Sequence, residues 1–542
     1  MTDAPTPYQR TLAFHQATKH HPDRYARSPG YMDWANQPNP FRSWADCETM
    51  ALPFIEKDPP GGHLELYTRS SGKPAPLALA TVAGFLELSL GLSAWKAAGD
   101  SRWALRINPS SGNLHPTEGY LILPAMEGIE AGIYHYDPLN HRLERRARMP
   151  ESIGTTIAGH FKTGGFMVAL TSIFWRESWK YGERAFRYCQ HDVGHALAAL
   201  GFSAALQGWQ LTVLGDLADS ALASLLGLDQ TDWPRLEAEH PDLAAWVHPA
   251  ADRVQVKNLP GELVAALGNL AFTGRPNRLS PTPVDWEIIK DVADATAKPP
   301  TQTPVPDLPV SNPVRTPSSA LTGAGIIRQR RSASAFDPDG SMDVSVLEAI
   351  LDKTLARSGC APFNAGIGPP SIDLVLFVHR VNGLTPGLYA LDRGTSTAAP
   401  LKTTMKSEFA WEAASSRLPF YLLEPGDLRH TAIELSCHQP IAGFGIFSLA
   451  MMARFERCIK EAPYRYRHLF WEAGMIGQIL YLEAEAHGFR GTGIGCYFDD
   501  AVHDLLGIDT LAWQSLYHFT VGVAKEDLRL TTYPPYHHLE RE

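Results

Sequence analysis

The 542-residue chain has few cysteines, and no two of them form a CxxC pair. The six cysteines are scattered singly along the chain, at Cys47, Cys189, Cys360, Cys437, Cys458 and Cys496. Such scattering is typical of a reducing compartment and argues against a framework of disulfides. We therefore expect a cytoplasmic protein.

Positive charge and long apolar runs are also scarce. The 48 lysines and arginines are outnumbered by 58 acidic residues, which leaves a net charge of -10 and argues against non-specific binding to nucleic acid or to an anionic membrane. The longest apolar stretch, near Ile441–Ala453, is too short to cross a bilayer. The first residues, MTDAPTPYQR, lack the pattern of a secretory signal. We expect neither a nucleic-acid nor a membrane partner.

What the sequence does contain is evidence of an internal duplication. Its length allows two to four domains, and the stretch Ala293–Ser319, with seven prolines, is typical of an extended linker. On either side of it, RYCQHDVGHALAALGFSAALQGWQ from Arg187 aligns without a gap with RHLFWEAGMIGQILYLEAEAHGFR from Arg467. Both copies predict a long buried helix, ended by Gly208 or Gly488.

Two further pairs support a duplication. AGIYHYD at Ala131 matches PGLYALD at Pro386, and TRSSG at Thr68 matches RRSAS at Arg330. Helices and short strands mix without a strict βαβ rhythm, so we predict an α+β fold in which two tandem domains pack as an intramolecular pseudo-dimer. The expected boundaries are an N-terminal extension 1–64, a first domain 65–292, a linker 293–320 and a second domain 321–542.

The segment RINPSSGNLHPTEGYLIL, residues 106–123, places polar residues before a buried strand. We expect the strand at Gly119–Leu123. The loop ahead of it, Ser110–Asn113, is either a surface that donates hydrogen bonds to a ligand or a turn that satisfies its own backbone.

Two segments of the second half suggest ligand contacts. RQRRSASAF from Arg328 offers arginines and hydroxyls for a phosphate, and its alternative is a solvated basic helix start. GFRGTGIGC, Gly488–Cys496, resembles a dinucleotide fingerprint but follows a helix instead of opening one, so we predict no Rossmann NAD site. It is a helix cap that runs into a strand, and its glycines allow a planar ligand to approach the backbone.

Two segments of the first half carry titratable side chains. HDVGH, His191–His195, approaches a zinc pattern but has no evident third ligand, so we expect no metal. FWRESWKYGERAF contains Lys180 and Tyr181, which serve proton transfer if packing shifts their pKa values, or else belong to a salt-bridged helix. The second copy has Lys460 and Glu461 there.

Together these segments resemble the nitroreductase superfamily, in particular the tandem form of its SagB/ThcOx-type azoline dehydrogenase branch. The resemblance rests on RRSASAF at Arg330, PSSGNLHP at Pro109, KYGERAFRYCQHDVGH at Lys180 and GTGIGCYFDD at Gly491. It implies an FMN-binding oxidoreductase of α+β fold whose flavin lies between two subunits, here between the two halves.

The resemblance also implies which residues form the site. Lys180 and Tyr181 would be catalytic, and the flavin would contact Ser110, Ser111, Asn113, Arg330, Arg331, Ser332, Ser334, Gly493, Gly495, Cys496 and Tyr497. Ser334 departs from the family pattern, which has a basic residue there. The equivalent second set, TRSSG, VLGDL and CAPFNAGIGPP, lacks the double arginine, the GxG loop, the serine pair and the tyrosine, so we expect it to be vestigial.

The implied reaction passes a hydride between substrate and flavin N5 while Lys180 and Tyr181 accept the proton or stabilise charge. Arg176, Arg184 and Arg187 are close enough in sequence to lower the pKa of Tyr181. Two alternatives stay open, an NAD(P)H-dependent nitro or quinone reductase and a flavin-free scaffold or binding subunit. The motifs fit a small-molecule or a peptide substrate, and they leave association between chains open.

Overall fold

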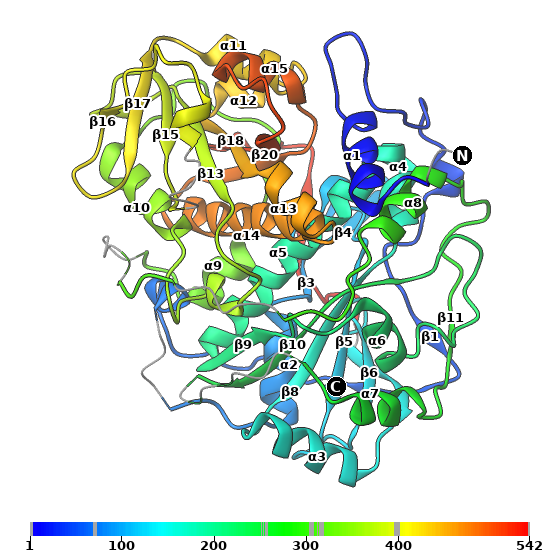
Figure 1. Cartoon of the computed structure of the whole chain (residues 1–542). Coiled ribbons are helices and arrows are strands. Elements are labelled where there is room, and N and C mark those ends of the chain that lie inside the picture. Colours follow the sequence, from blue (N-terminus) through cyan, green and yellow to red (C-terminus); the bar gives the residue numbers. More distant parts are fainter. Residues whose placement is uncertain are drawn as a thin grey trace.

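The computed structural model describes the chain except residues 1–3, 69–72, 251, 253, 255–257, 303–307, 312, 314–318, 395–400 and 540–542. Two large sheets, one in each half, lie on either side of a layer of helices (Figure 1). No helix among the described residues combines the length and apolar character needed to cross a membrane.

The sheet of the first half has seven antiparallel strands in the order β2-β7-β6-β5-β8-β10-β9. Their bounds are β2 Glu48–Ala51, β5 Thr117–Leu123, β6 Gly132–Asp137, β7 Arg142–Arg148, β8 Phe166–Ser172, β9 Trp209–Val213 and β10 His240–Pro249. The predicted strand before Leu123 is confirmed, and all seven residues of β5 are buried. A strand with both faces covered reads as the continuous apolar run seen in the sequence.

The second half repeats this order as β16-β17-β15-β13-β18-β20-β19. Its strands are β13 Ile372–Val378, β15 Gly387–Leu391, β16 Glu412–Ala413, β17 Phe420–Pro425, β18 Phe447–Arg454, β19 Arg490–Ile494 and β20 Trp513–Gly522. The strands β6 and β15, which carry the AGIYHYD and PGLYALD sequences, hold the same place in their sheets. The predicted duplication and the α+β class are therefore confirmed.

The two long helices predicted by the 280-residue offset are α5 (Ala185–Leu206) and α14 (Arg465–Ala486). They pack on each other between the sheets (Figure 1). A Cβ atom on Gly194 would overlap the carbonyl of Trp471, and one on Gly474 would overlap the carbonyl of His191. These two contacts are the same contact made twice, so the glycines mark the pseudo-twofold axis of the pseudo-dimer.

Shorter helices surround this centre. In the first half they are α1 Pro7–Ala17, α2 Leu79–Glu87, α3 Glu151–Phe161, α4 Phe174–Tyr181, α6 Asp219–Leu225, α7 Gly261–Gly268 and α8 Glu287–Ala295. In the second half they are α9 Gly323–Gln329, α10 Val344–Thr354, α11 Arg429–Leu435, α12 Ile441–Phe444, α13 Phe455–Glu461 and α15 Asp499–Leu506. The predicted linker begins inside α8, because Val292 and Ala295 are buried on a helix that packs against α1.

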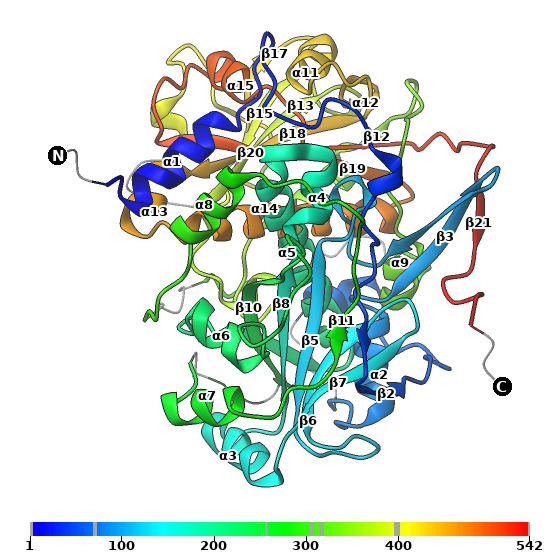
Figure 2. The same ribbon diagram turned by 90° about the vertical axis from the view of Figure 1, so that its right-hand side faces the viewer.

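Both chain ends cross to the opposite half. Helix α1 packs against α13 of the second half, and β21 (Thr531–Tyr533) pairs with β3 (Leu92–Ala98), which pairs in turn with β4 (Ser101–Arg106) (Figure 2). The remaining strands form short pairs, β1 Trp44–Ala45 with β11 Arg275–Pro276 and β12 Met342–Asp343 with β14 Val381–Asn382. These crossings fasten the halves together around their interface.

Candidate functional site

A cavity of about 670 Å³ lies between the two halves, and residues of both line it. The sequence-predicted residues around it are Ser110, Ser111, Asn113, Tyr181, Arg330, Arg331, Ser332, Ser334, Gly493, Gly495 and Cys496. The segment that contains Ser332 runs beside β19 through a bridge to Gly491. The volume lies in the range of about 300–1,000 Å³ that is usual for small-molecule and cofactor sites.

The polar loop before β5 is held by its own side chains. Ser110 Oγ accepts a hydrogen bond from the backbone N–H of His115 (2.8 Å). Ser111 donates to the carboxylate of Asp192 from both its N–H and its hydroxyl (3.1 Å each). Asn113 donates from its amide to the carbonyl of Ala104 (2.9 Å). These bonds brace the loop against α5 and β4 and leave it lining the cavity, so ligand contact by the loop stays a prediction.

Gly112 lets a tyrosine approach beneath this loop. Its φ is +58°, a conformation that favours glycine, and a Cβ atom there would collide with the hydroxyl of Tyr181. The ammonium of Lys180 is close to the same point and lies 5.2 Å from the centre of the Tyr181 ring. Tyr181 lines the cavity, whereas Lys180 stands beside the loop and does not line it.

Two buried carboxyl groups, Glu177 on α4 and Asp192 on α5, lie under the loop. Burial raises the pKa of Asp192 to about 7, although Ser110 and Ser111 donate to it. Burial and the like charge of Asp192 raise the pKa of Glu177 well above its usual value. Two such neighbours cannot both ionise easily, so the pair retains a proton near neutral pH. Sequence reasoning missed Glu177, although an acid one turn before Lys180 on a buried helix was a usable signal.

The expected activation of Tyr181 by arginines is not seen. Burial and the charge of Glu177 raise the pKa of Tyr181 well above its usual value. Arg176 pairs with Glu118, and Arg184 and Arg187 pair with Asp499. Because these guanidinium groups are paired elsewhere, Tyr181 stays a neutral phenol and suits proton donation better than proton abstraction.

A buried cationic corner forms another part of the wall. Arg330 donates to the carbonyl of Arg106 (3.0 Å), and its guanidinium lies 5.1 Å from the centre of the Tyr481 ring. The Nε atoms of Arg330 and Arg106 are buried and have no hydrogen-bond partner among the described residues. Both arginines line the cavity, so this corner offers cationic side chains to an anionic group such as a phosphate.

The two residues that follow Arg330 already have hydrogen-bond partners within the protein. Arg331 donates to the carbonyls of Arg328 and Arg330 and, across the interface, to the carbonyl of Ser93 (2.9 Å). Burial and the charge of Arg330 lower the pKa of Arg331 to about 10, which leaves it charged at neutral pH. Ser332 donates to the hydroxyl of Tyr481 (2.9 Å). Arg331 therefore ties the halves together, while Arg330 has donor capacity to spare.

The glycines of β19 and the following segment are needed for what lies beside them. A Cβ atom on Gly493 would overlap the hydroxyl of Tyr517, and one on Gly495 would overlap the ring of Tyr188. Tyr497 does not line the cavity, contrary to expectation. It is fully buried, donates to the carbonyl of Ser515 (3.0 Å) and stacks on a histidine ring, so its side chain belongs to the core behind the wall.

The HDVGH motif has divided roles. His191 lies against the carbonyl of Leu516 (3.1 Å), and His195 lies near the hydroxyl of Tyr517 (3.2 Å). The described residues contain no group of three histidine, cysteine or acidic side chains placed to hold a metal ion. The second residue of the motif, Asp192, is the one that supports the loop.

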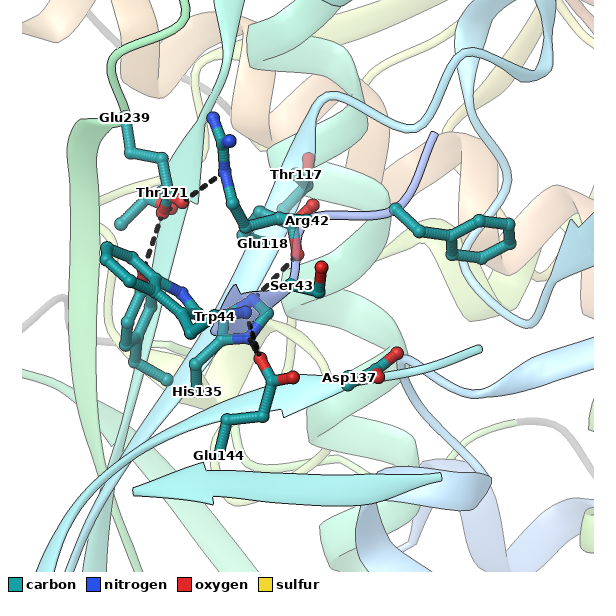
Figure 3. A network of polar contacts seen from close by, with 12 residues as sticks. Arg42, Ser43, Trp44, Thr117, Glu118, His135, Asp137, Glu144, Thr171 and Glu239 are labelled. Carbon is teal, nitrogen blue, oxygen red and sulfur yellow. Dashed lines mark hydrogen bonds and ion pairs between the residues drawn. The ribbon is translucent and has the colours of Figure 1, made fainter. Parts of the chain in front are cut away.

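A buried ionic network lies on the first sheet (Figure 3), and Arg176 connects it to the same loop. His135 lies between Glu118 (3.0 Å) and Glu144 (2.9 Å). Burial opposes its protonation, but the two carboxylates outweigh it and raise the pKa of His135 to about 9. Glu118 also pairs with Arg176, which donates to the carbonyl of His115 at the end of the loop (2.6 Å). The network thus connects the sheet to the wall of the cavity.

The equivalent corner on the other side of the axis encloses only about 20 Å³. It is lined by Val213–Leu217, the loop residues Gly366 and Ile367, and Trp471. Lys298 donates to the carbonyl of Leu217 (2.9 Å), and Thr301 donates to the carbonyl of Gly215 (3.0 Å). This space is sufficient for about one water molecule. Of the TRSSG segment, residues 69–72 lie outside the described residues.

Comparison with known proteins gives one family. The model of the nitroreductase family matches residues 76–236 and 327–523, which is one match in each half. A crystal structure of a putative nitroreductase from Anabaena variabilis superposes with a TM-score of 0.69 at 20% identity, and the match covers 95% of this chain and 99% of that one. This likeness extends over both halves and concerns the fold.

Two curated relatives match shorter segments. The trifolitoxin-processing protein TfxB of Rhizobium leguminosarum bv. trifolii is 32% identical over 130 residues, which are 22% of this chain and 35% of that protein. Putative nitroreductase MJ1384 of Methanocaldococcus jannaschii is 25% identical over 128 residues, which are 22% of this chain and 64% of that protein. The chain thus spans less than two thirds of the length of either relative.

Proposed function

Because the chain belongs to the nitroreductase family, we propose that it is an FMN-dependent oxidoreductase with one flavin between its two halves. The observation that carries this proposal is the 670 Å³ cavity between the halves, whose wall includes three arginines, Arg106, Arg330 and Arg331. A flavin nucleotide requires both a roomy pocket and cationic donors for its phosphate.

Each wall of the cavity has a part in this proposal. Arg106 and Arg330 would hold the phosphate, and the Ser110–Asn113 loop would form a wall for the remainder of the nucleotide. When bound, FMN supplies hydride transfer. The protein itself keeps Tyr181 and the carboxyl pair on the first-half side of the cavity.

The proton chemistry belongs to the first half. Tyr181 is a neutral phenol that donates a hydrogen bond to a reacting group in the cavity. The Glu177–Asp192 pair holds a proton near neutral pH and releases it on further ionisation. Lys180 stands close to Tyr181 and to Glu177, and it stabilises the negative charge that results from ionisation of the pair. Together these groups can take up or supply the proton that accompanies a hydride.

Among the reactions open to this family we propose a SagB/ThcOx-type dehydrogenase. The match to TfxB, a trifolitoxin-processing protein, favours enzymatic modification of a substrate molecule over an NAD(P)H-dependent nitro or quinone reductase. We further propose that the protein is cytoplasmic and that its substrate is a small molecule or a peptide.

Flavin content and reduction test the proposal. Freshly purified protein should be yellow and hold about one FMN per chain, and NADH or NADPH should reduce that flavin slowly. Rapid reduction by either nucleotide would support the reductase instead. Protein that is colourless and cannot be reconstituted with FMN would support a flavin-free scaffold, and two FMN per chain would mean that the second corner opens.

A further inference from the structure

Two cysteines and a histidine to which the proposed reaction assigns no step lie close together beside the cavity, and one of them, Cys496, is also an expected flavin contact. Cys437 and Cys496 both line the cavity, and both are half-buried. His20 reaches them from the N-terminal extension, which has no counterpart in the second half. The cluster therefore places two nucleophilic thiols where a solute in the cavity can reach them.

The backbone holds the two cysteines next to each other. Phe498 N–H donates to the carbonyl of Leu435 (2.8 Å), and the amide of Gln439 donates to the carbonyl of Cys496 (3.0 Å). These bonds fasten the loop after α11 to the segment after β19. The two cysteine side chains line the same cavity and are close enough for each to shift the pKa of the other. Cys437 is also in the left-handed region, with φ of +52°, a conformation that other residues than glycine seldom adopt.

The surroundings of Cys496 favour a thiolate. The N–H of Ala26 donates to His20 Nδ1 (2.9 Å), so the neutral ring carries its hydrogen on Nε2 and can donate from there to Cys496. The hydrogen bond from Cys437, with smaller contributions from His20 and the Arg184 cation, lowers the pKa of Cys496 to about 5 against the opposing effect of burial. The thiolate is the reactive form of cysteine.

Cys437 has the opposite property. Its hydrogen bond to Cys496 and its burial raise its pKa, so it remains a thiol while its neighbour is ionised. One ionised sulfur beside one protonated sulfur is the arrangement of an attacking and a resolving cysteine.

We propose that Cys496 and Cys437 form a redox-active pair in which the Cys496 thiolate attacks a peroxide and Cys437 resolves the product. In the first step an S–O bond forms at Cys496, the O–O bond of hydrogen peroxide breaks, and hydroxide leaves and is protonated to water. In the second step the Cys437 sulfur, after losing its proton to solvent, attacks the sulfenic sulfur. An S–S bond forms, the S–O bond breaks, and the leaving hydroxide takes up a proton. Two thiols lose two electrons, and the peroxide becomes two water molecules.

The test uses the full-length protein as purified, treated with hydrogen peroxide at neutral pH, blocked with N-ethylmaleimide and digested for mass spectrometry. We expect a disulfide between the peptides of Cys437 and Cys496. Cys47 is the internal control because it is also half-buried, yet burial raises its pKa to about 11. It should be oxidised at least about tenfold more slowly.

Three variants separate the roles. Cys437→Ser should leave a sulfenic acid on Cys496 that dimedone traps, and Cys496→Ser should give neither product. His20→Asn keeps an acceptor for the Ala26 N–H and should slow oxidation of Cys496 severalfold. The proposal is overturned if Cys47 in the unaltered protein reacts as fast as Cys496, if Cys496 pairs with a different cysteine, or if Cys437→Ser still gives the same product. The peroxide is added from outside, so none of these outcomes depends on the flavin proposal.

Discussion

The two halves build equivalent corners at their interface, one of about 670 Å³ and one of about 20 Å³. Trp471 lines the small corner, whereas His191, its equivalent under the 280-residue offset, is not among the described residues that line the large one. The linker adds Lys298 and Thr301, which bond to the wall of the small corner. The backbone scaffold is therefore repeated, whereas in the small corner a bulky side chain and a stretch of linker occupy the space.

The outer faces of the two sheets differ in the same way. His135 and its two carboxylates lie on the first sheet, and the matched position in the second sheet is Ala390, within an apolar cluster. The ionic network of the first sheet reaches the cavity loop through Arg176. The half that supplies the polar loop thus also carries the buried charges that brace it.

The largest expected effect concerns catalysis on the first-half side of the large corner. Tyr181→Phe and Lys180→Ala should each lower turnover by roughly 10²–10⁴, the usual contribution of a general acid or base, and leave FMN bound. Lys460→Ala, at the exposed equivalent position in the second half, should change neither. Loss of flavin from either first-half variant, with activity restored by added FMN, would refute the catalytic assignment.

Removing the Trp471 side chain from the small corner should lower the stability of the fold and should not create a second flavin site. Trp471→Ala removes a buried ring that donates to Gln190 (2.7 Å), so the free energy of unfolding should fall by about 3–5 kcal/mol. Trp471→Phe should lower the free energy of unfolding by a smaller amount. Thermal denaturation and flavin content measure both effects. A second FMN bound by Trp471→Ala would show that this side chain alone separates the two corners.

The ionic network predicts a pH dependence that the second sheet lacks. The folded-state pKa of His135, about 9, lies above its unfolded value of about 6.5. Its stabilisation is therefore complete below pH 6.5 and disappears as the pH rises through 9, a change on the order of 3 kcal/mol. The melting temperature of His135→Gln should lie below that of the unaltered protein at pH 6 and approach it above pH 9. A gap that stays constant with pH would contradict this account.

The smallest expected effect is on flavin affinity. Arg330→Ala removes a charge-assisted hydrogen bond worth roughly 1.5–3 kcal/mol and should weaken FMN binding about ten- to a hundredfold. Lys298→Ala changes a cation of the small corner and should leave the affinity unchanged. Fluorescence titration of the apoproteins with FMN measures both. If Lys298→Ala weakens FMN binding and Arg330→Ala does not, the flavin lies in the small corner and our assignment is wrong.

The sequence was sufficient to predict the repeated scaffold, because matched glycines and an ungapped offset reveal two helices that meet at Gly194 and Gly474. It also predicted that the loop at Ser110 and the segment around Gly493 belong to one site, because a pseudo-dimer brings such segments together. Both predictions rest on patterns that extend over many residues.

Individual side-chain directions were harder. Cys496 and Tyr497 are neighbours, yet one lines the cavity and the other lies in the core, because successive residues of an extended segment point to opposite sides. Arg106 reads as the end of a strand, and only the folded chain places it beside Arg330. The pairing of Arg184 with Asp499 instead of Tyr181 likewise depends on tertiary contacts.

The linker, which includes Lys298 and Thr301, affects how the assembly of the site depends on protein concentration. In a dimer of separate chains, a site shared by two subunits is lost on dilution, because each must find its partner again. Here the second half is tethered to the first, and a tether keeps its partner at a local concentration that dilution does not change. A cell that holds only a few copies of this chain therefore holds the same number of assembled sites.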